Sequence, residues 1–140
     1  MLILGIESSC DDTSAALVEA NEGGFVVLAE KTASQIEVHK KYGGVVPEIA
    51  GRKHAENILP VIEEVLSGQK KPEVICVTSG PGLITGLLVG VEAAKSLSYL
   101  WNIPLVSVNH INGHIHSVEI RNPKSEIRNK IEFPTLCLVV

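Results

Sequence analysis

The chain has 140 residues, a hydrophobic fraction of 45% and a formal net charge of -4. That length suits one domain or one lobe of a larger protein. The negative net charge excludes binding of nucleic acid through the overall charge of the chain. Contact with nucleic acid would need a local basic patch or a partner protein. Widely spaced cysteines without a C-x-x-C pair favour a reducing, cytoplasmic compartment. Neither a signal peptide nor a membrane-spanning segment is predicted.

The first third of the chain predicts an antiparallel meander of three strands. Leu2–Glu7 is apolar on both faces and predicts a short strand, which a polar turn over residues 8–13 follows. Residues 14–20 and 25–33 are the next two strand candidates. The run Asn-Glu-Gly-Gly at 21–24 tolerates positive φ and marks a hairpin between them.

The hydrophobic period then becomes helical. Pro47 suits the first turn of a helix, and apolar residues recur at helical spacing up to Leu66, with Gly68 as the expected stop. Pro60 lies inside this segment and is expected to kink or divide the helix.

The remaining sequence alternates between strands and helices. Residues 73–78 predict a strand that is buried on both faces. Residues 85–100 predict a helix whose inward-facing side chains are Ala93, Ala94, Leu97 and Leu100.

Further along, residues 104–108 predict another buried strand, and a helix is expected over residues 109–120 with Asn109 as its N-cap. A polar loop over 121–130 and an apolar strand over 133–140 complete the order.

This order of elements predicts the class α/β. Three antiparallel strands followed by right-handed βα crossovers build a mixed sheet covered by helices. The order matches one lobe of the actin, Hsp70 and sugar kinase (ASKHA) superfamily, which folds like ribonuclease H.

The first candidate for chemistry is the turn after the opening strand, in the run GIESSCDDTS from Gly5. Its hydroxyls and backbone N–H groups, Ser9 among them, can hold phosphate, and Asp11 or Asp12 can position magnesium or a water molecule. For so short a motif, a polar turn with two solvated aspartates is the alternative.

A second candidate is the loop Ser-Gly-Pro-Gly at 79–82 between a strand and a helix. Gly80 and Gly82 let the backbone approach a ligand closely, and a helix N-terminus favours anions. No Lys-Ser or Lys-Thr follows, so this is not a Walker loop. A tight βα turn without a ligand is the alternative.

A third candidate is the run VNHINGHIHS from Val108. His110 and His114 are four residues apart, so on a helix they share a face and can chelate one metal ion. A zinc protease of the H-E-x-x-H type would need Glu where Ile111 stands, which disfavours hydrolysis by that mechanism. A pair of surface or capping histidines is the alternative.

Other conspicuous residues have structural interpretations. His39 and His54 are expected to be solvated helix or loop positions. Cys76 and Cys137 are expected to be small core residues in strands. Trp101 is expected to pack at a helix end.

Together, four blocks resemble the TsaD family in order and spacing: GIESSCDDTS, YGGVVPEIAGRKH, SGPGLITGLLVG and VNHINGHIHS. The resemblance covers nearly the whole chain. The second and fourth blocks favour TsaD over its non-catalytic paralogue TsaB, which carries a similar GPG block.

This resemblance implies an ASKHA fold and one divalent metal ion, iron or zinc, held by His110, His114 and a ligand from a missing lobe. It also implies that Asp11 acts at the reacting centre. The substrate-binding residues that follow from the resemblance and from the two loops are Ser9, Asp12, Gly80, Gly82, Val139 and Val140.

The implied reaction transfers threonylcarbamoyl from threonylcarbamoyl-AMP to N6 of the adenosine next to the anticodon, in tRNAs that read codons beginning with A. The implied partners are tRNA, a TsaB-like paralogue and a TsaE-like P-loop ATPase. Residues 1–140 would then be the N-terminal lobe, without its C-terminal lobe and inactive alone. A TsaB-like dimerisation partner and a metalloendopeptidase are the alternative functions.

Overall fold

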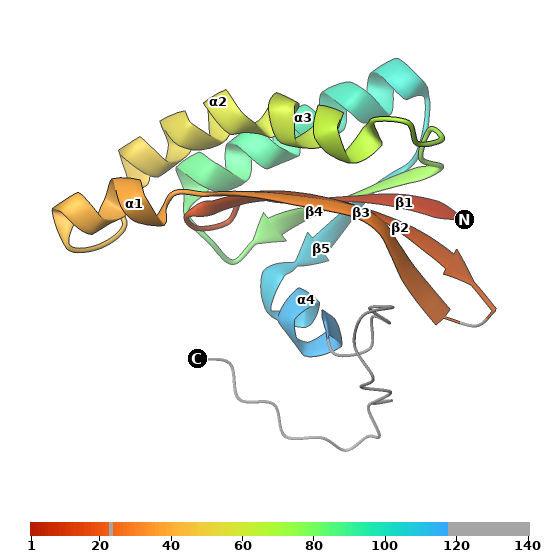
Figure 1. The fold of residues 1–140 in the computed structure, drawn as a ribbon, viewed down its shortest axis with the longest axis horizontal. Coiled ribbons are helices and arrows are strands. Elements are labelled where there is room, and N and C mark those ends of the chain that lie inside the picture. Colours follow the sequence, from red (N-terminus) through yellow and green to blue (C-terminus); the bar gives the residue numbers. More distant parts are fainter. Residues whose placement is uncertain (23, 118–140) are drawn as a thin grey trace.

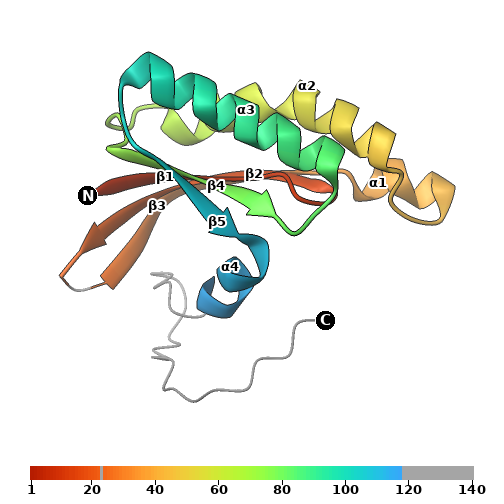
Figure 2. The same cartoon turned by 180° about the vertical axis from the view of Figure 1, so that it is seen from behind.

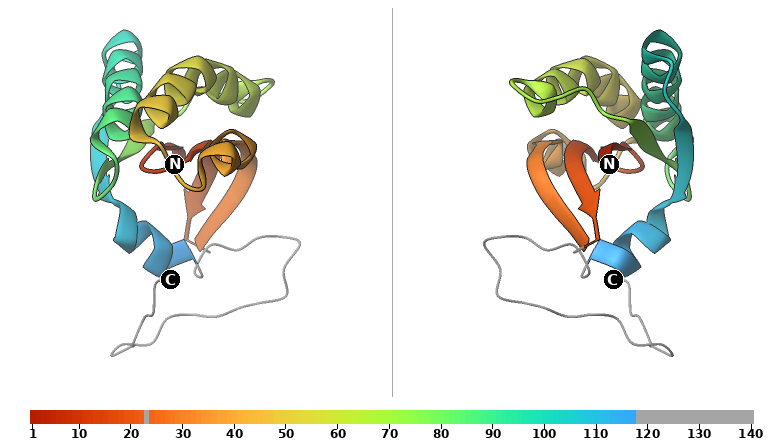
Figure 3. Two further views of the ribbon diagram at one scale, coloured as in Figure 1. Left: turned by 90° about the vertical axis from the view of Figure 1, so that its left-hand side faces the viewer. Right: turned by 90° about the vertical axis from the view of Figure 1, so that its right-hand side faces the viewer.

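The computed structural model describes residues 1–22 and 24–117 of the chain. Within this part, one sheet has the strand order β3-β2-β1-β4-β5, and helices α2 and α3 cover one of its faces (Figure 1). Views from behind and from the two sides place α4 on the opposite side of the sheet (Figures 2 and 3). The elements in chain order are β1 (Leu2–Glu7), β2 (Asp12–Asn21), β3 (Gly24–Ser34), α1 (Ile36–His39), the 3-10 helix η1 (Lys40–Tyr42), α2 (Pro47–Leu66), β4 (Val74–Gly80), α3 (Ile84–Trp101), β5 (Leu105–Asn109) and α4 (His110–His116).

The N-terminal half of the sheet is the predicted antiparallel meander. β1 pairs with β2, and β2 pairs with β3 through a hairpin at the predicted position. Gly24 in this hairpin has a φ of 117°, which residues with a Cβ rarely adopt. β1 then pairs in parallel with β4, and β4 pairs in parallel with β5. The predicted mixed sheet is therefore confirmed.

Helix α2 begins and ends where the sequence predicts. Pro47 is its first residue, and Gly68 follows its end with a φ of 71°, which suits a helix stop. Pro60 lies inside the helix, which continues as one element to Leu66, so Pro60 does not divide it. The face of α2 that packs on the sheet carries the buried residues Ile58, Val61, Ile62 and Val65.

The core lies between the sheet and the two long helices. It joins Leu4 and Leu17 of the meander to Ile75 of β4 and Ala94 of α3, all with no exposed surface. The helices approach closely at Gly51, where a Cβ would lie 2.9 Å from the Cβ of Thr85. The hydroxyl of Thr85 also donates a hydrogen bond to the carbonyl of Pro47, at 2.9 Å.

Three burial predictions are wrong. Strand β5 is not buried, because it is the edge of the described sheet and its Val106 is 45% exposed. Strand β4 is buried only on the face toward the helices, which carries Ile75 and Val77, while Cys76 on the other face is half-buried. Leu100 is 73% exposed, because the inward stripe of α3 continues from Ala94 and Leu97 to Trp101.

The prediction for Trp101 is confirmed, whereas those for the C-terminal segment fall on residues that the structure does not describe. Trp101 packs against the core at the end of α3, as expected. The predicted loop over 121–130, the strand over 133–140 and the end of the helix at residue 120 lie outside the described residues.

Candidate functional site

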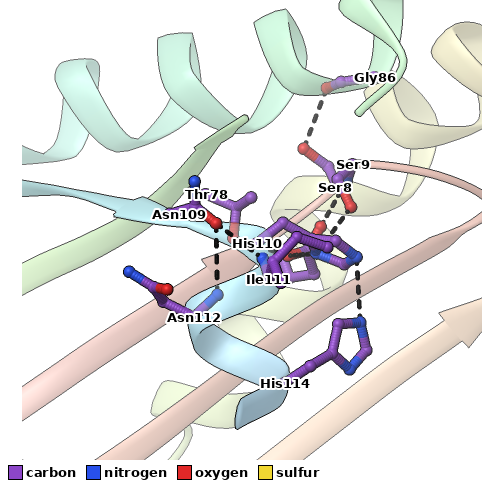
Figure 4. A network of polar contacts seen from close by, with 10 residues as sticks. Ser8, Ser9, Thr78, Gly86, Asn109, His110, Ile111, Asn112 and His114 are labelled. Carbon is purple, nitrogen blue, oxygen red and sulfur yellow. Dashed lines mark hydrogen bonds and ion pairs between the residues drawn. The ribbon is translucent and has the colours of Figure 1, made fainter. Parts of the chain in front are cut away.

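The candidate site lies where three parallel strands end side by side. β1, β4 and β5 run in the same direction, so their carboxyl ends meet at one edge of the sheet, which is where sites in α/β folds form. Glu7 is the last residue of β1, Thr78 lies near the end of β4, and Asn109 ends β5. Figure 4 shows the polar contacts at the start of α4, among them those of Asn109 with Ile111 and Asn112 and the contact between His110 and His114.

The end of β5 fixes the position of the two histidines. The side-chain oxygen of Asn109 accepts hydrogen bonds from the backbone N–H groups of Ile111 and Asn112, so Asn109 is the predicted N-cap of α4. His110 and His114 consequently lie on one face of the helix, one turn apart. Their Nε2 atoms are 3.0 Å apart and their rings are nearly perpendicular, with centroids 4.5 Å apart. Neither histidine is buried in apolar core.

Glu7 lies directly behind His110, and the sequence interpretation missed it. Its Oε2 accepts a hydrogen bond from the Thr78 hydroxyl at 2.6 Å and lies 3.1 Å from His110 Nδ1. Its Oε1 accepts from the Ser9 backbone N–H. Burial raises the pKa of the Glu7 carboxyl, but hydrogen bonds from Ser9, Thr78 and His110 outweigh it and lower the pKa below the usual value. The available signal was a carboxylate at the end of an otherwise apolar strand.

The first turn contacts the same histidine through Ser9. The Oγ atom of Ser9 is 3.1 Å from His110 Nδ1. Helix α3 packs against the back of this turn, where the buried Ser8 hydroxyl donates to the Gly86 carbonyl at 2.9 Å. A Cβ at Gly82 would lie 2.6 Å from the Ser9 carbonyl oxygen, so Gly82 permits a close approach to this turn. Gly80 has a φ of 154°, and nothing lies within 4 Å of a Cβ built there.

The same turn also carries the two candidate aspartates, Asp11 and Asp12. Asp11 lines a hollow together with residues of α1, η1 and the following loop, and His110 is not among the lining residues. Within the described part of the chain, Ser9 is the turn residue whose side chain contacts His110. Asp12 begins β2, and its Oδ1 is buried without a hydrogen-bond partner in the described part of the chain.

His39 and His54 are not solvated, which corrects the prediction for both. His54 is fully buried, with Nδ1 2.8 Å from the Thr13 hydroxyl and Nε2 3.1 Å from the Cys10 carbonyl. It therefore ties α2 to the first turn. His39 is 3% exposed, and its Nε2 is 3.0 Å from Gln35 Oε1. Both were misjudged because a histidine inside a polar run gives no sequence signal of burial.

The histidine pair fits one divalent metal ion. Two nitrogen ligands on a tetrahedral zinc ion lie about 3.3–3.4 Å apart, close to the observed 3.0 Å between the Nε2 atoms. No group of three or more His, Cys, Asp or Glu residues that could hold a metal occurs among residues 1–22 and 24–117, so this part of the chain would supply His110 and His114 alone. Val139 and Val140, predicted to bind substrate, lie outside the described residues.

The sequence model of the family described as TsaD, tRNA N6-adenosine threonylcarbamoyltransferase, matches residues 26–140. The chain belongs to the TsaD family. A family member named tRNA N6-adenosine threonylcarbamoyltransferase from Symbiobacterium thermophilum is 50% identical over 99% of this chain. A second, with the same name, from Bacillus subtilis is 49% identical over the whole chain. In both cases the chain spans 39% of the length of the relative.

Solved structures support the predicted ribonuclease H-like fold. YeaZ from Pseudomonas aeruginosa superposes with a TM-score of 0.62 at 17% identity, over 85% of this chain and 48% of YeaZ. RuvC from T. thermophilus, in complex with Holliday junction substrate, gives a TM-score of 0.52 at 13% identity, over 85% of this chain and 73% of RuvC. Among the described residues, no helix has the length and apolar character needed to cross a membrane.

Proposed function

We propose that this chain is the N-terminal lobe of a tRNA N6-adenosine threonylcarbamoyltransferase. The enzyme would transfer threonylcarbamoyl from threonylcarbamoyl-AMP to N6 of the adenosine next to the anticodon, in tRNAs that read codons beginning with A. Membership of the TsaD family supports this assignment. The observation that carries it is the convergence of His110 and His114 at the end of β5, with their Nε2 atoms 3.0 Å apart.

His110 and His114 would hold one divalent metal ion, iron or zinc. Their imidazole nitrogens are ligands that suit both metals. A third ligand would come from the C-terminal lobe, since no third His, Cys, Asp or Glu completes a metal-binding group among the described residues. When bound, such an ion polarises a carbonyl or phosphoryl oxygen as a Lewis acid.

The substrate of this reaction is an activated mixed anhydride, so no protein nucleophile is required. Asp11 would accept the proton of the attacking adenine amine or position that amine. Asp12, the first residue of β2, would contribute to substrate binding beside Asp11. The Ser9 hydroxyl, Gly80 and Gly82 would line the adenylate.

The negative net charge of the chain bears on how it would bind tRNA. A charge of -4 does not attract a polyanion, so a local basic patch or a partner protein would supply the phosphate contacts. The proposed partners are a TsaB-like paralogue and a TsaE-like P-loop ATPase. Because tRNA is the proposed substrate, we propose a cytoplasmic location.

A chimera tests this function. Residues 1–140 replace the matching segment of the Bacillus subtilis relative, to which they are 49% identical. The chimera is then the only source of the activity in Bacillus subtilis cells. Digested tRNA should contain threonylcarbamoyladenosine, measured by liquid chromatography and mass spectrometry. A folded chimera that yields none of the modified nucleoside would contradict the proposal.

Point variants of the chimera test the residue roles. His110→Ala or His114→Ala should lower the modification by on the order of 100-fold or more, because several kcal/mol of transition-state stabilisation are lost. His116→Ala is the matched control, since it removes a histidine from another face of α4. Asp11→Ala should abolish modification without unfolding the protein, and normal modification by that variant would remove Asp11 from the mechanism.

The second candidate function is a TsaB-like binding partner without catalysis. The histidine pair favours the enzyme, because a lobe that only dimerises has no use for two converging imidazoles. Metal analysis of the purified chimera separates the two functions. Metal that is lost on His110→Ala supports the enzyme, and a metal-free wild-type chimera supports the binding role.

A further inference from the structure

The contact between Glu7 and His110 constrains where the imidazole carries its proton. Glu7 Oε2 lies 3.1 Å from His110 Nδ1, within hydrogen-bonding distance. An ionised carboxylate can only accept hydrogen bonds. The same oxygen already accepts from the Thr78 hydroxyl at 2.6 Å, and the Ser9 backbone N–H binds the other oxygen. Contacts from β4 and from the first turn therefore fix the Glu7 carboxylate independently of the His110 imidazole.

Ser9 offers a competing arrangement, since its Oγ is also 3.1 Å from His110 Nδ1. If the hydroxyl donated to Nδ1, the ring would carry its proton on Nε2. The Nδ1 lone pair would then face the anionic Glu7 oxygen at 3.1 Å, which is a repulsive contact between two acceptors. A proton on Nδ1 removes this repulsion, and both Glu7 and Ser9 can then accept from it. The geometry therefore favours the Nδ1–H form.

We propose that Glu7 is a positioning residue that holds His110 in its Nδ1–H tautomer and turns the Nε2 lone pair toward His114. This inference rests on the proposed metal site, because a histidine binds a metal ion through a deprotonated nitrogen. A carboxylate behind a ligand histidine fixes the ring orientation and raises the basicity of the ligand nitrogen. The same tautomer allows His114 Nε2–H to donate to His110 Nε2 across the observed 3.0 Å.

Nuclear magnetic resonance of the ¹⁵N-labelled 140-residue chain tests the tautomer directly. Long-range ¹H–¹⁵N correlations at neutral pH should show a protonated Nδ1 and an unprotonated Nε2 for His110. Glu7→Gln should give a mixture of the two tautomers, because the amide can either accept or donate at Nδ1. Ser9→Ala should keep the wild-type tautomer. Glu7→Asp, whose carboxylate is too short to reach the ring, serves in place of Glu7→Gln if that variant does not fold.

Zinc titration of the same samples, followed by the histidine resonances, gives the second measurement. The Kd for Zn²⁺ should rise about 10- to 100-fold in Glu7→Gln, as for other residues that orient a metal ligand. Ser9→Ala should leave the Kd close to that of the wild type. His110→Ala and His114→Ala should each remove the zinc-dependent shifts.

The results of the zinc titration distinguish failure of the proposed metal site from failure of the proposed role of Glu7. If the histidine variants bind zinc as the wild type does, the metal site itself is wrong. If they lose zinc but Glu7→Gln keeps both the tautomer and the Kd, the metal site stands and the role of Glu7 is refuted. A wild-type His110 protonated on Nε2 would also refute it and would assign Ser9 as the partner of Nδ1.

Discussion

Gly86 of α3 packs directly against the turn that presents Ser9 to His110, so an added methyl group there tests the architecture of the site. A Cβ at Gly86 would lie 2.4 Å from the Ser8 carbonyl oxygen and 3.0 Å from the ring of His54. Real Cβ atoms essentially never come within 3.0 Å of another heavy atom, so the turn or the helix must move. The obstacle is a backbone oxygen, which no side-chain rotation can relieve.

The magnitude of the effect of Gly86→Ala follows from three terms. Alanine is favoured over glycine by up to about 1 kcal/mol in a helix interior, and by less at Gly86, which is the third residue of α3. Overpacking costs about 1–3 kcal/mol. Separating the turn from α3 also weakens the hydrogen bond from the Ser8 hydroxyl to the Gly86 carbonyl, which contributes about 1 kcal/mol. The unfolding free energy should therefore fall by roughly 1–3 kcal/mol, and Tm by roughly 3–10 °C.

The assay is thermal and urea unfolding of the chain, followed by circular dichroism. The matched control is Gly113→Ala in α4, where nothing lies within 4 Å of an added Cβ. That variant should be as stable as the wild type or more stable by up to about 1 kcal/mol. If Gly86→Ala is also as stable as the wild type, α3 does not pack against the turn as described.

Three other predictions concern His54, Cys10 and the chain as a whole. His54→Ala should lower the unfolding free energy by about 2–4 kcal/mol, because it leaves a cavity and removes the partner of the buried Thr13 hydroxyl. Thr13→Val should cost less in that background than it does alone. Although Cys10 is exposed as a residue, partial burial of the thiol and the neighbouring Asp11 carboxylate raise its pKa. The midpoint of the pH–alkylation profile of Cys10 should therefore lie above that of an ordinary cysteine, and it should fall in Asp11→Asn. An unchanged midpoint in Asp11→Asn would exclude the effect of Asp11. The 140-residue chain supplied with threonylcarbamoyl-AMP, the partner proteins and unmodified tRNA should form no threonylcarbamoyladenosine, and turnover comparable to that of a full-length enzyme would show that one lobe suffices.

Local sequence signals predicted the architecture well. Alternation and turn residues predicted the meander, and Pro47 and Gly68 marked the two ends of α2. What local signals could not give was the lateral position of each strand in the sheet. Residues 104–108 are as apolar as a central strand, yet β5 lies at the edge of the described sheet. Burial depends on pairing across the chain, which the composition of one strand does not specify.

The site was predictable where its residues are neighbours in sequence. The spacing of His110 and His114 predicts one helical face, and Asn109 predicts where the helix begins. Glu7 is 103 positions from His110, and only the parallel pairing of β1, β4 and β5 brings them together. The burial of His54 likewise depends on contacts between α2 and the first turn, 41 and 44 residues away in sequence.

The cap of α4 offers a test of the site that changes neither histidine. Asn109 accepts from two backbone N–H groups at the start of a helix of seven residues, which is too short to be stable without such support. Asn109→Ala should cost about 1 kcal/mol of local helix stability. In the frayed helix, the Nε2 atoms of His110 and His114 should lie close together for a smaller fraction of the time. The Kd of the chain for Zn²⁺ should then rise by up to about 5-fold. Asn109→Asp keeps an oxygen that caps the helix and should bind zinc nearly as the wild type does. An unchanged Kd in Asn109→Ala would show that contacts of His110 with Glu7 and Ser9 hold the pair together without the cap.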